Sequence, residues 1–296
     1  MSSVDLAVSL FRRLEGGDFR VLQGLELGMT QYRFVPLEEV VRYSSLPPSE
    51  VGFRISNLHR LGLVYRWVGP YVGYALNTAG YDCLALNALV KGGILEALGK
   101  PLGVGKEADV YDALTPEGER VAVKFHRIGR TSFRDTRRKR GYEGDRRHIS
   151  WLYRSRLAAE REFEALKLVH PVGVAVPRPI RQNRHVIVMG LIEGWELAEV
   201  GEIDEAEAVL DEVLENVRLS YQKAGVIHAD LSEYNIIIQA DGHVLLIDWP
   251  QYVTREHPNA EDLLRRDVRN VLNYFRRKFR VRRSLEEELA RIKGEA

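Results

Sequence analysis

Three polar residues in the C-terminal half of the chain could bind a metal ion and accept a proton. Asn235 stands five positions after Asp230, and Asp248 follows two short apolar runs joined by a turn. A hairpin there would return the chain, so that Asp248 lies beside the loop carrying Asp230. Carboxylate and amide oxygens suit Mg²⁺, whose coordination phosphates and water can complete. The spacing predicts phosphoryl transfer from ATP, with Asp230 at the attacking hydroxyl and Asn235 and Asp248 on magnesium.

Each of these residues alone could be an ordinary turn or cap residue. The apolar runs that separate Asn235 from Asp248, Ile236–Gln239 and Val244–Ile247, favour the catalytic interpretation because they read as the two strands of a hairpin.

A glycine-rich segment lies between two predicted strands much earlier in the chain. It reads Gly103-Val104-Gly105-Lys106-Glu107. Glycine lets a backbone fold closely over phosphates. The segment is not a Walker A loop, because no Gly-Lys-Ser/Thr opens a helix there. By itself the pattern is weak, since such turns are common. In this context it predicts nucleotide contacts from Gly103, Gly105, Lys106 and Glu107.

A lysine ends the predicted strand that follows this loop. In Val121-Ala122-Val123-Lys124, the ammonium group could hold the α- and β-phosphates if a helix glutamate paired with it. Glu162 is the predicted partner, and Glu160 is the competitor. Lys124 alone could be a surface lysine. The order of loop, lysine, helix glutamate, aspartate, asparagine and second aspartate is that of a protein kinase.

These motifs resemble the RIO family of atypical serine/threonine protein kinases, in particular its winged-helix-bearing type two branch. The segments that carry the resemblance are Gly105–Tyr111, Val123–His126, His228–Asn235 and Ile247–Gln251. The chain departs from the family pattern at Ala108, where a serine is usual, and at Gly190, where a glutamate is frequent.

The resemblance implies a trimmed kinase fold and an ATP- and Mg²⁺-dependent kinase or ATPase, with Mn²⁺ as a substitute ion. It implies that Asp230 is the catalytic base and that Asp248 can be transiently phosphorylated. Backbone groups at Met189, Gly190 and Ile192 would receive adenine. Ser132 is similar to an autophosphorylated position. The implied setting is maturation of the small ribosomal subunit, on a precursor particle of rRNA and ribosomal proteins.

The N-terminal region predicts a winged helix. The expected elements of this region are helices Val4–Leu14, Arg20–Met29, Leu37–Tyr43 and Pro48–Leu61, strands Leu63–Val68 and Tyr71–Leu76, and a connecting helix Thr78–Val90. The second helix of the helix-turn-helix offers Arg54, Asn57, His59 and Arg60, and the wing adds Arg66. Binding to RNA or to a ribosomal particle is favoured over simple packing against protein.

The remaining chain predicts strands and helices that alternate. The expected elements are strands Leu98–Leu102, Asp109–Ala113, Arg120–His126 and Val186–Met189, and helices Ile149–Leu168, 204–224, Leu263–Arg277 and Leu285–Ile292. The predicted fold class is α+β, with a winged-helix domain over 1–90 and a bilobal kinase-like domain over 91–296. The lobes would divide near residue 189.

Composition excludes several other classes of protein. The 296 residues carry 43 Lys and Arg against 42 Asp and Glu, so net charge predicts no partner. One stretch is basic: 127–147 holds nine Arg or Lys and three acids, which suits contact with rRNA phosphates. Cys83 is the single cysteine, which excludes an internal disulfide. We expect a cytoplasmic protein without a membrane span.

Two other functions fit part of the pattern. A small-molecule phosphotransferase of the aminoglycoside or choline type also carries a His-x-Asp loop and an Ile-Asp-Trp strand. The Gly-Lys-Glu loop and the preceding winged helix argue against it. A nucleic-acid-binding regulator with an inactive kinase domain is the second, and Lys124, Asp230, Asn235 and Asp248 argue against that.

Overall fold

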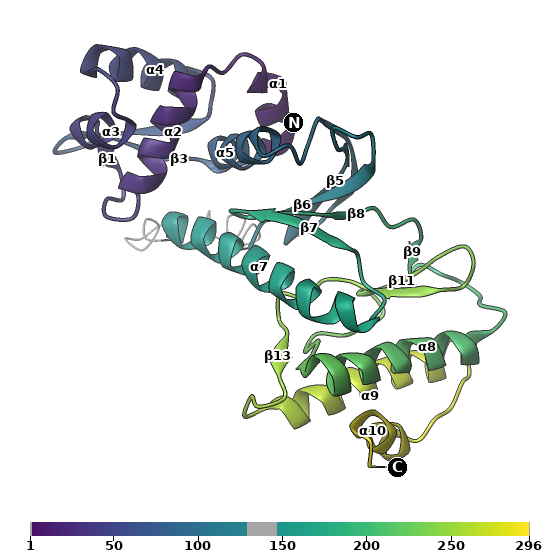
Figure 1. Cartoon of the computed structure of the whole chain (residues 1–296). Coiled ribbons are helices and arrows are strands. Elements are labelled where there is room, and N and C mark those ends of the chain that lie inside the picture. The colour runs from purple at the N-terminus through teal and green to yellow at the C-terminus, as the bar shows by residue number, and fades with distance from the viewer. Residues whose placement is uncertain (1, 129–146, 296) are drawn as a thin grey trace. The chain divides into compact units, whose positions relative to one another are not determined.

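The computed structural model describes residues 2–128 and 147–295 (Figure 1). Ser132 and most of the basic stretch lie outside them. The chain divides into two compact units, each described here by itself. The first comprises the described parts of Met1–Glu119 and Arg127–Ser155, and the second comprises Arg120–His126 and Arg156–Glu295.

A winged helix forms most of the first unit, which confirms the predicted order of elements. Its helices are α1 (Ser3–Phe11), α2 (Gly16–Gly28), α3 (Leu37–Ser44), α4 (Pro48–Arg60) and α5 (Thr78–Lys91). Its strands are β1 (Val35–Pro36), β2 (Val64–Val68) and β3 (Val72–Leu76), in the antiparallel order β1-β3-β2. The two-residue strand β1 is too short to show an alternating pattern in the sequence.

Helix α5 has no polar face, because it is buried on most sides. Ala79, Leu84, Ala85 and Leu89 are each at most 4 % exposed. Gly80 permits a close approach to the wing: a Cβ at this position would lie 2.2 Å from the carbonyl oxygen of Leu63. Asn77 caps the helix by accepting a hydrogen bond from the Gly80 N–H. These contacts fix the start of α5 against Leu63, immediately before strand β2 of the wing.

Strands β4 (Ala97–Val104) and β5 (Ala108–Leu114) complete the first unit as an antiparallel pair. The glycine-rich segment forms the connection between them. The Gly105 N–H donates to the carbonyl of Ala108 over 2.8 Å and closes the turn.

The second unit begins with an antiparallel sheet. Its strands are β6 (Arg120–His126), β8 (Val186–Gly190) and β7 (Pro179–Asn183), hydrogen-bonded in that order. Helix α7 (Arg147–Val169) continues into this unit and ends in a short 3₁₀ turn, His170–Val172. Strands β6 and β8 are almost wholly buried, which explains their strong apolar pattern in the sequence, whereas β7 carries Arg181-Gln182-Asn183 and escaped prediction.

Helices and short strands form the rest of the second unit. The helices are α8 (Ala206–Leu219), a π-helical turn (Ser220–Ala224), α9 (Ala260–Lys278) and α10 (Leu285–Lys293). The strands are β9 (Trp195–Glu196), β10 (Val226–Ile227), β11 (Ile236–Ile238), β12 (Val244–Leu246) and β13 (Val253–Thr254). The predicted hairpin is present as β11–β12, with Ile237 opposite Leu245. Among the described helices, none combines the length and the apolar character that crossing a bilayer requires.

Candidate active site

Lys124 lies at the centre of a cluster of charged groups within the second unit. Its Nζ atom lies 2.7 and 2.8 Å from the two carboxylate oxygens of Glu162 and 2.7 Å from Oδ1 of Asp248. Lys124 comes from β6, Glu162 from α7 and Asp248 from the segment after β12. Three elements far apart in sequence therefore bring two carboxylates to one ammonium group.

Because Lys124 and Glu162 are buried, each needs the charge of its partner to stay ionised. Lys124 is 7 % exposed and Glu162 is 1 % exposed, whereas the Asp248 side chain is 41 % exposed. Desolvation opposes the charge of Lys124, but the two carboxylates more than offset it and raise the pKa of Lys124. Desolvation also opposes the charge of Glu162, but Lys124 overcomes it and lowers the pKa of Glu162 to about 2. The pair is therefore ionised at neutral pH, with Asp248 on the accessible side.

The competition between the two helix glutamates has a clear structural outcome. Glu162 points to Lys124, and Nε2 of His126 also lies 2.9 Å from its Oε2. Glu160 instead accepts a hydrogen bond from Nε of Arg156 over 2.8 Å on the exposed face of α7. Two positions along a helix correspond to opposite faces, so both glutamates cannot serve the same lysine.

The loop that carries Asp230 and Asn235 is tied together by its own polar groups. Nδ2 of Asn235 donates to the carbonyl of Asp230 over 2.8 Å. The backbone of Asn235 accepts a hydrogen bond from the Ile247 N–H over 3.0 Å, immediately before Asp248. The Asp230 side chain is exposed. These bonds keep Asp230 available to solvent and hold Asn235 next to the strand that leads to Asp248.

Asp267 of α9 supports this loop through hydrogen bonds that the sequence pattern did not predict. Its carboxylate accepts hydrogen bonds from the backbone N–H groups of Ala229, over 2.7 Å, and Leu231, over 3.2 Å. Ala229 has the left-handed φ of 63°, an uncommon conformation for alanine that the two bonds on either side hold in place. Burial raises the pKa of Asp267 to about 6.

A signal for Asp267 was present in the sequence. Asp267 stands on the apolar stripe of α9, next to Val268 and one turn after Leu264, and it is 1 % exposed. A carboxylate on a buried face needs a specific partner. Here the partners are backbone groups of the loop that presents Asp230.

Asp248 itself adopts a left-handed conformation, with φ of 66°. The residues on either side are anchored. Trp249 is fully buried with its ring centroid 4.5 Å from that of His228, and Nε2 of His228 lies 2.9 Å from the carbonyl oxygen of Ile247. Burial lowers the pKa of His228, which favours the neutral ring. A strained backbone conformation at a non-glycine residue persists only where the surrounding contacts hold it in place, and such residues are frequent at functional sites.

The residues around Asp248 fit a magnesium ion that is shared with phosphates. The Asn235 amide uses Nδ2 for its bond to Asp230, which leaves Oδ1 as the ligand atom. Asp248 supplies a second hard oxygen. Among the residues that the structure describes, no group of three His, Cys, Asp or Glu side chains could hold a metal by itself. A site of two protein ligands is what Mg²⁺ uses when phosphate oxygens and water complete its shell.

The segment predicted to receive adenine follows strand β8. Met189 is buried and pairs with Ala122 of β6, and the Gly190 N–H donates to the carbonyl of Arg178 over 2.9 Å. The N–H of Gly190 is therefore already engaged. A Cβ on Gly190 would meet Arg178 at ordinary contact distances of 3.5 Å or more, so the space would accommodate a side chain. Ile192 lies two residues beyond the strand and is partly exposed.

The glycine-rich segment belongs to the first unit. Gly103 pairs with Val110, and the residues Gly103, Gly105, Lys106 and Glu107 are all exposed. The Glu107 carbonyl accepts a hydrogen bond from the Arg127 N–H over 2.6 Å. The loop is therefore held at its return end and open to solvent along its length.

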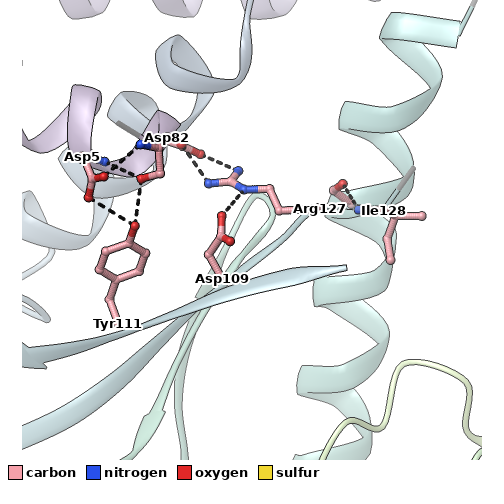
Figure 2. A network of polar contacts seen from close by, with 8 residues as sticks. Asp5, Asp82, Asp109, Tyr111, Arg127 and Ile128 are labelled. Carbon is pink, nitrogen blue, oxygen red and sulfur yellow. Dashed lines mark hydrogen bonds and ion pairs between the residues drawn. The ribbon is translucent and has the colours of Figure 1, made fainter. Parts of the chain in front are cut away.

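A buried charge network in the first unit was also missed (Figure 2). The Arg127 guanidinium binds both oxygens of Asp82 on α5, over 2.8 and 2.9 Å, and Oδ2 of Asp109 on β5 over 3.0 Å. Arg127 is 2 % exposed and both aspartates are fully buried. The network joins the winged-helix region to the strand after the glycine-rich segment. Its members are separated by 18 and 45 positions, so spacing alone gave no signal.

The winged helix offers less free charge than its sequence suggests. Arg54 binds Glu50 over 2.8 Å and both Glu15 and Asp18 over 3.1 Å. His59 lies 3.1 Å from the Val64 carbonyl through Nδ1, and Arg60 donates to Asn57 over 2.5 Å. Three carboxylates around Arg54 remove it as a candidate for phosphate contact. Arg60 and Arg66 remain exposed.

Comparisons with known proteins show the family of the chain. Two family models match the chain: the RIO domain over residues 109–288 and the Rio2 N-terminal domain over residues 11–92. The RIO-type serine/threonine-protein kinase Rio2 of Methanocaldococcus jannaschii is 46 % identical over 254 residues, which cover 84 % of this chain and 92 % of that protein. The serine/threonine-protein kinase RIO2 of Caenorhabditis elegans is 40 % identical over 92 % of this chain and 51 % of its own length.

A solved structure covers nearly the whole chain. The Rio2 kinase–ADP/Mg²⁺–phosphoaspartate complex from Chaetomium thermophilum has a TM-score of 0.84 and 32 % identity, over 95 % of this chain and 87 % of that one. The match includes both the N-terminal domain and the kinase domain.

Proposed function

Because the chain belongs to the Rio2 family of serine/threonine protein kinases, we propose that it transfers the γ-phosphoryl group of ATP with Mg²⁺ and acts in maturation of the small ribosomal subunit. The observation that carries the phosphoryl-transfer part is the Lys124–Glu162–Asp248 cluster, beside a loop that holds Asn235 and presents Asp230. The family also argues against the small-molecule phosphotransferase that the sequence had left open.

Each residue has a distinct task in this proposal. Lys124, kept charged by Glu162, binds phosphate oxygens and so positions the triphosphate. Asn235 and Asp248 hold magnesium, which when bound neutralises charge on the phosphates. Asp230 accepts the proton of the attacking hydroxyl when a protein serine is the acceptor.

Asp248 is also our proposed acceptor of the phosphoryl group in an ATPase cycle. A carboxylate oxygen forms a bond to the γ-phosphorus as the bond between that phosphorus and the β–γ bridging oxygen breaks, and ADP leaves. Water then cleaves the acyl phosphate to inorganic phosphate and restores the carboxylate. The phosphoaspartate in the Chaetomium thermophilum kinase supports this chemistry for a relative. In this chain the same chemistry is supported by the exposure of the Asp248 side chain, which is 41 % exposed and can therefore be reached by a phosphate.

Single-turnover hydrolysis of γ-labelled ATP tests the assignment. We expect Asp248→Asn to abolish hydroxylamine-labile label on the protein, and Asp230→Ala to slow transfer to a serine acceptor by at least about 10²-fold. Asp241→Asn is the matched control, because Asp241 is exposed in the β11–β12 turn, where its side chain accepts a bond from the His243 N–H. Wild-type rates in both active-site variants would refute the proposed roles.

The ribosomal part of the proposal rests on family membership and needs its own measurement. Sedimentation of the protein with precursor particles from cell extract, with and without ATP, is the direct assay. We expect Asp248→Asn to remain on the particle longer than wild type, because turnover is blocked.

Autophosphorylation at Ser132 is likewise proposed from the resemblance, and peptide mass spectrometry of wild type and Ser132→Ala tests it. The cytoplasmic location stays a prediction.

A further inference from the structure

The end of α9 and the segment that follows it form a strongly basic region in the second unit. Residues 269–283 contain six arginines, one lysine and no acidic residue. The arginines surround a hollow of about 920 Å³, which is lined by residues of α9, by the segment after it and by the first residue of α10. The residues that line it are Arg269, Leu272, Asn273, Arg276, Arg277, Arg280, Arg282, Arg283 and Leu285. We call this feature the arginine hollow.

The helix geometry gathers these charges on one side. Arg269, Asn273 and Arg276 follow one another at intervals of four and three residues, which places them along one face of α9. All six arginines of the hollow are exposed. The chain then turns at Arg280, which has a left-handed φ of 64°, and brings Arg282 and Arg283 to the same hollow.

These arginines have few acidic partners. Arg283 lies 3.2 Å from Asp211 of α8, and both side chains are partly exposed. In the part of the chain that the structure describes, the other five form no salt bridge. By contrast, Arg54, Arg127, Arg218 and Arg265 each bind a carboxylate at 2.5–2.8 Å. The hollow therefore holds more positive charge than nearby carboxylates balance.

Helix stability explains only part of this charge. Cations in the last turn of a helix interact favourably with its dipole, which accounts for Arg276, Arg277 and Lys278. Arg269 stands more than two turns before the end of α9, and Arg280 and Arg282 come after it. The arginines without a salt bridge also repel one another, so binding of an anionic partner would lower the electrostatic free energy of this region.

We propose that the arginine hollow binds the phosphodiester backbone of RNA. A planar guanidinium donates two parallel hydrogen bonds to a phosphate, and every lining cation is arginine. The volume is far larger than one phosphate needs, which suits several consecutive phosphates. The Asn273 amide adds a donor and acceptor for a ribose hydroxyl or a base edge. The choice of RNA over DNA rests on the proposed ribosomal function, whereas the anionic backbone itself is inferred from the hollow.

Fluorescence anisotropy of the full chain with a labelled, unstructured RNA tests this inference at several salt concentrations. The variant is Arg276→Gln with Arg280→Gln and Arg282→Gln. Loss of three phosphate contacts makes the negative slope of log affinity against log salt shallower by about 2 and weakens binding about 100-fold at about 0.1 M salt. The control carries Arg156→Gln, Lys167→Gln and Arg181→Gln, which remove three exposed charges elsewhere in the same unit. We expect it to bind as wild type.

Three results would overturn the proposal. The first is an unchanged salt slope in the hollow variant. The second is a polyglutamate peptide that displaces the labelled RNA as well as unlabelled RNA does, which would assign the hollow to an acidic protein. The third is equally tight binding of a DNA of the same sequence, which would remove the choice of RNA. ATP turnover measured without RNA separates this proposal from the proposed function. We expect the hollow variant to retain the turnover of the wild type. If the active-site assignment were wrong, Asp230→Ala and Asp248→Asn would instead leave turnover intact.

Discussion

Replacing Arg127 with methionine should destabilise the first unit in a way that depends on pH. The guanidinium binds Asp82 and Asp109, and all three side chains are buried. Removing one partner of a buried ion pair typically costs about 3–5 kcal/mol, because the charge left behind is uncompensated. In Arg127→Met the groups left behind are carboxylates, and carboxylates can escape this cost by taking up a proton.

The sign follows from linkage between protonation and folding. Without the cation, burial raises the pKa of at least one aspartate in the folded variant above its unfolded value of about 3.9. Stability then rises as pH falls, by about 1.4 kcal/mol per pH unit for each carboxylate protonated only in the folded state. Between pH 8 and pH 6, one such carboxylate would return about 2.7 kcal/mol of the loss.

Asp82→Ala supplies the contrast that makes the test sharp. It leaves the buried guanidinium paired with Asp109, and a guanidinium cannot lose its proton near neutral pH. We therefore expect a loss of stability smaller than that of Arg127→Met, which stays constant between pH 6 and pH 8. Arg42→Met is the control, because Arg42 pairs with Glu39 on the surface of α3, and an exposed pair contributes at most about 1 kcal/mol.

Urea denaturation of the full chain, followed by circular dichroism at both pH values, measures these differences. The reasoning is refuted if Arg127→Met and Asp82→Ala show the same dependence on pH. It is equally refuted if Arg127→Met is no less stable than Arg42→Met, since the network would then contribute nothing beyond surface charge.

Three further predictions concern single buried groups. Glu162→Gln should reduce ATP turnover by about 10²-fold, because Lys124 loses its buried counter-charge, while Glu160→Gln should behave as wild type in the same assay. Burial raises the pKa of Asp267 to about 6, so the protonated group favours the folded state at low pH and this contribution is lost as pH rises through 6. The difference in unfolding free energy between wild type and Asp267→Asn should therefore change by about 2.4 kcal/mol from pH 4 to pH 8. A difference that stays constant over this range would contradict the burial argument. Burial raises the pKa of the Cys83 thiol, so at pH 8 a thiol reagent should modify Cys83 only in urea, and rapid labelling of the native chain would show that α5 opens.

Local patterns predicted most of the fold. The helices of the winged helix and the strand Arg120–His126 lie close to their predicted bounds, because amphipathic spacing and continuous apolar runs depend on nearby residues. The strands that escaped prediction are the polar β7 and the strands of two residues, β1, β9, β10 and β13. Strands of two residues, such as β9 and β13, exist only because a distant segment pairs with them.

The sequence by itself determined which chemical groups are present and in what order, and this was enough to predict a RIO-type kinase with Lys124, Asp230, Asn235 and Asp248 as its site. Only the tertiary structure decided which groups meet. It paired Lys124 with Glu162 and not Glu160, placed Asp267 under the loop of Asp230, enclosed Arg127 between two aspartates, and gathered the arginines of α9 around one hollow. The reason is physical: a motif is a relation between neighbours in the chain, whereas the energy of a charge depends on its burial and on partners that the chain brings from far away.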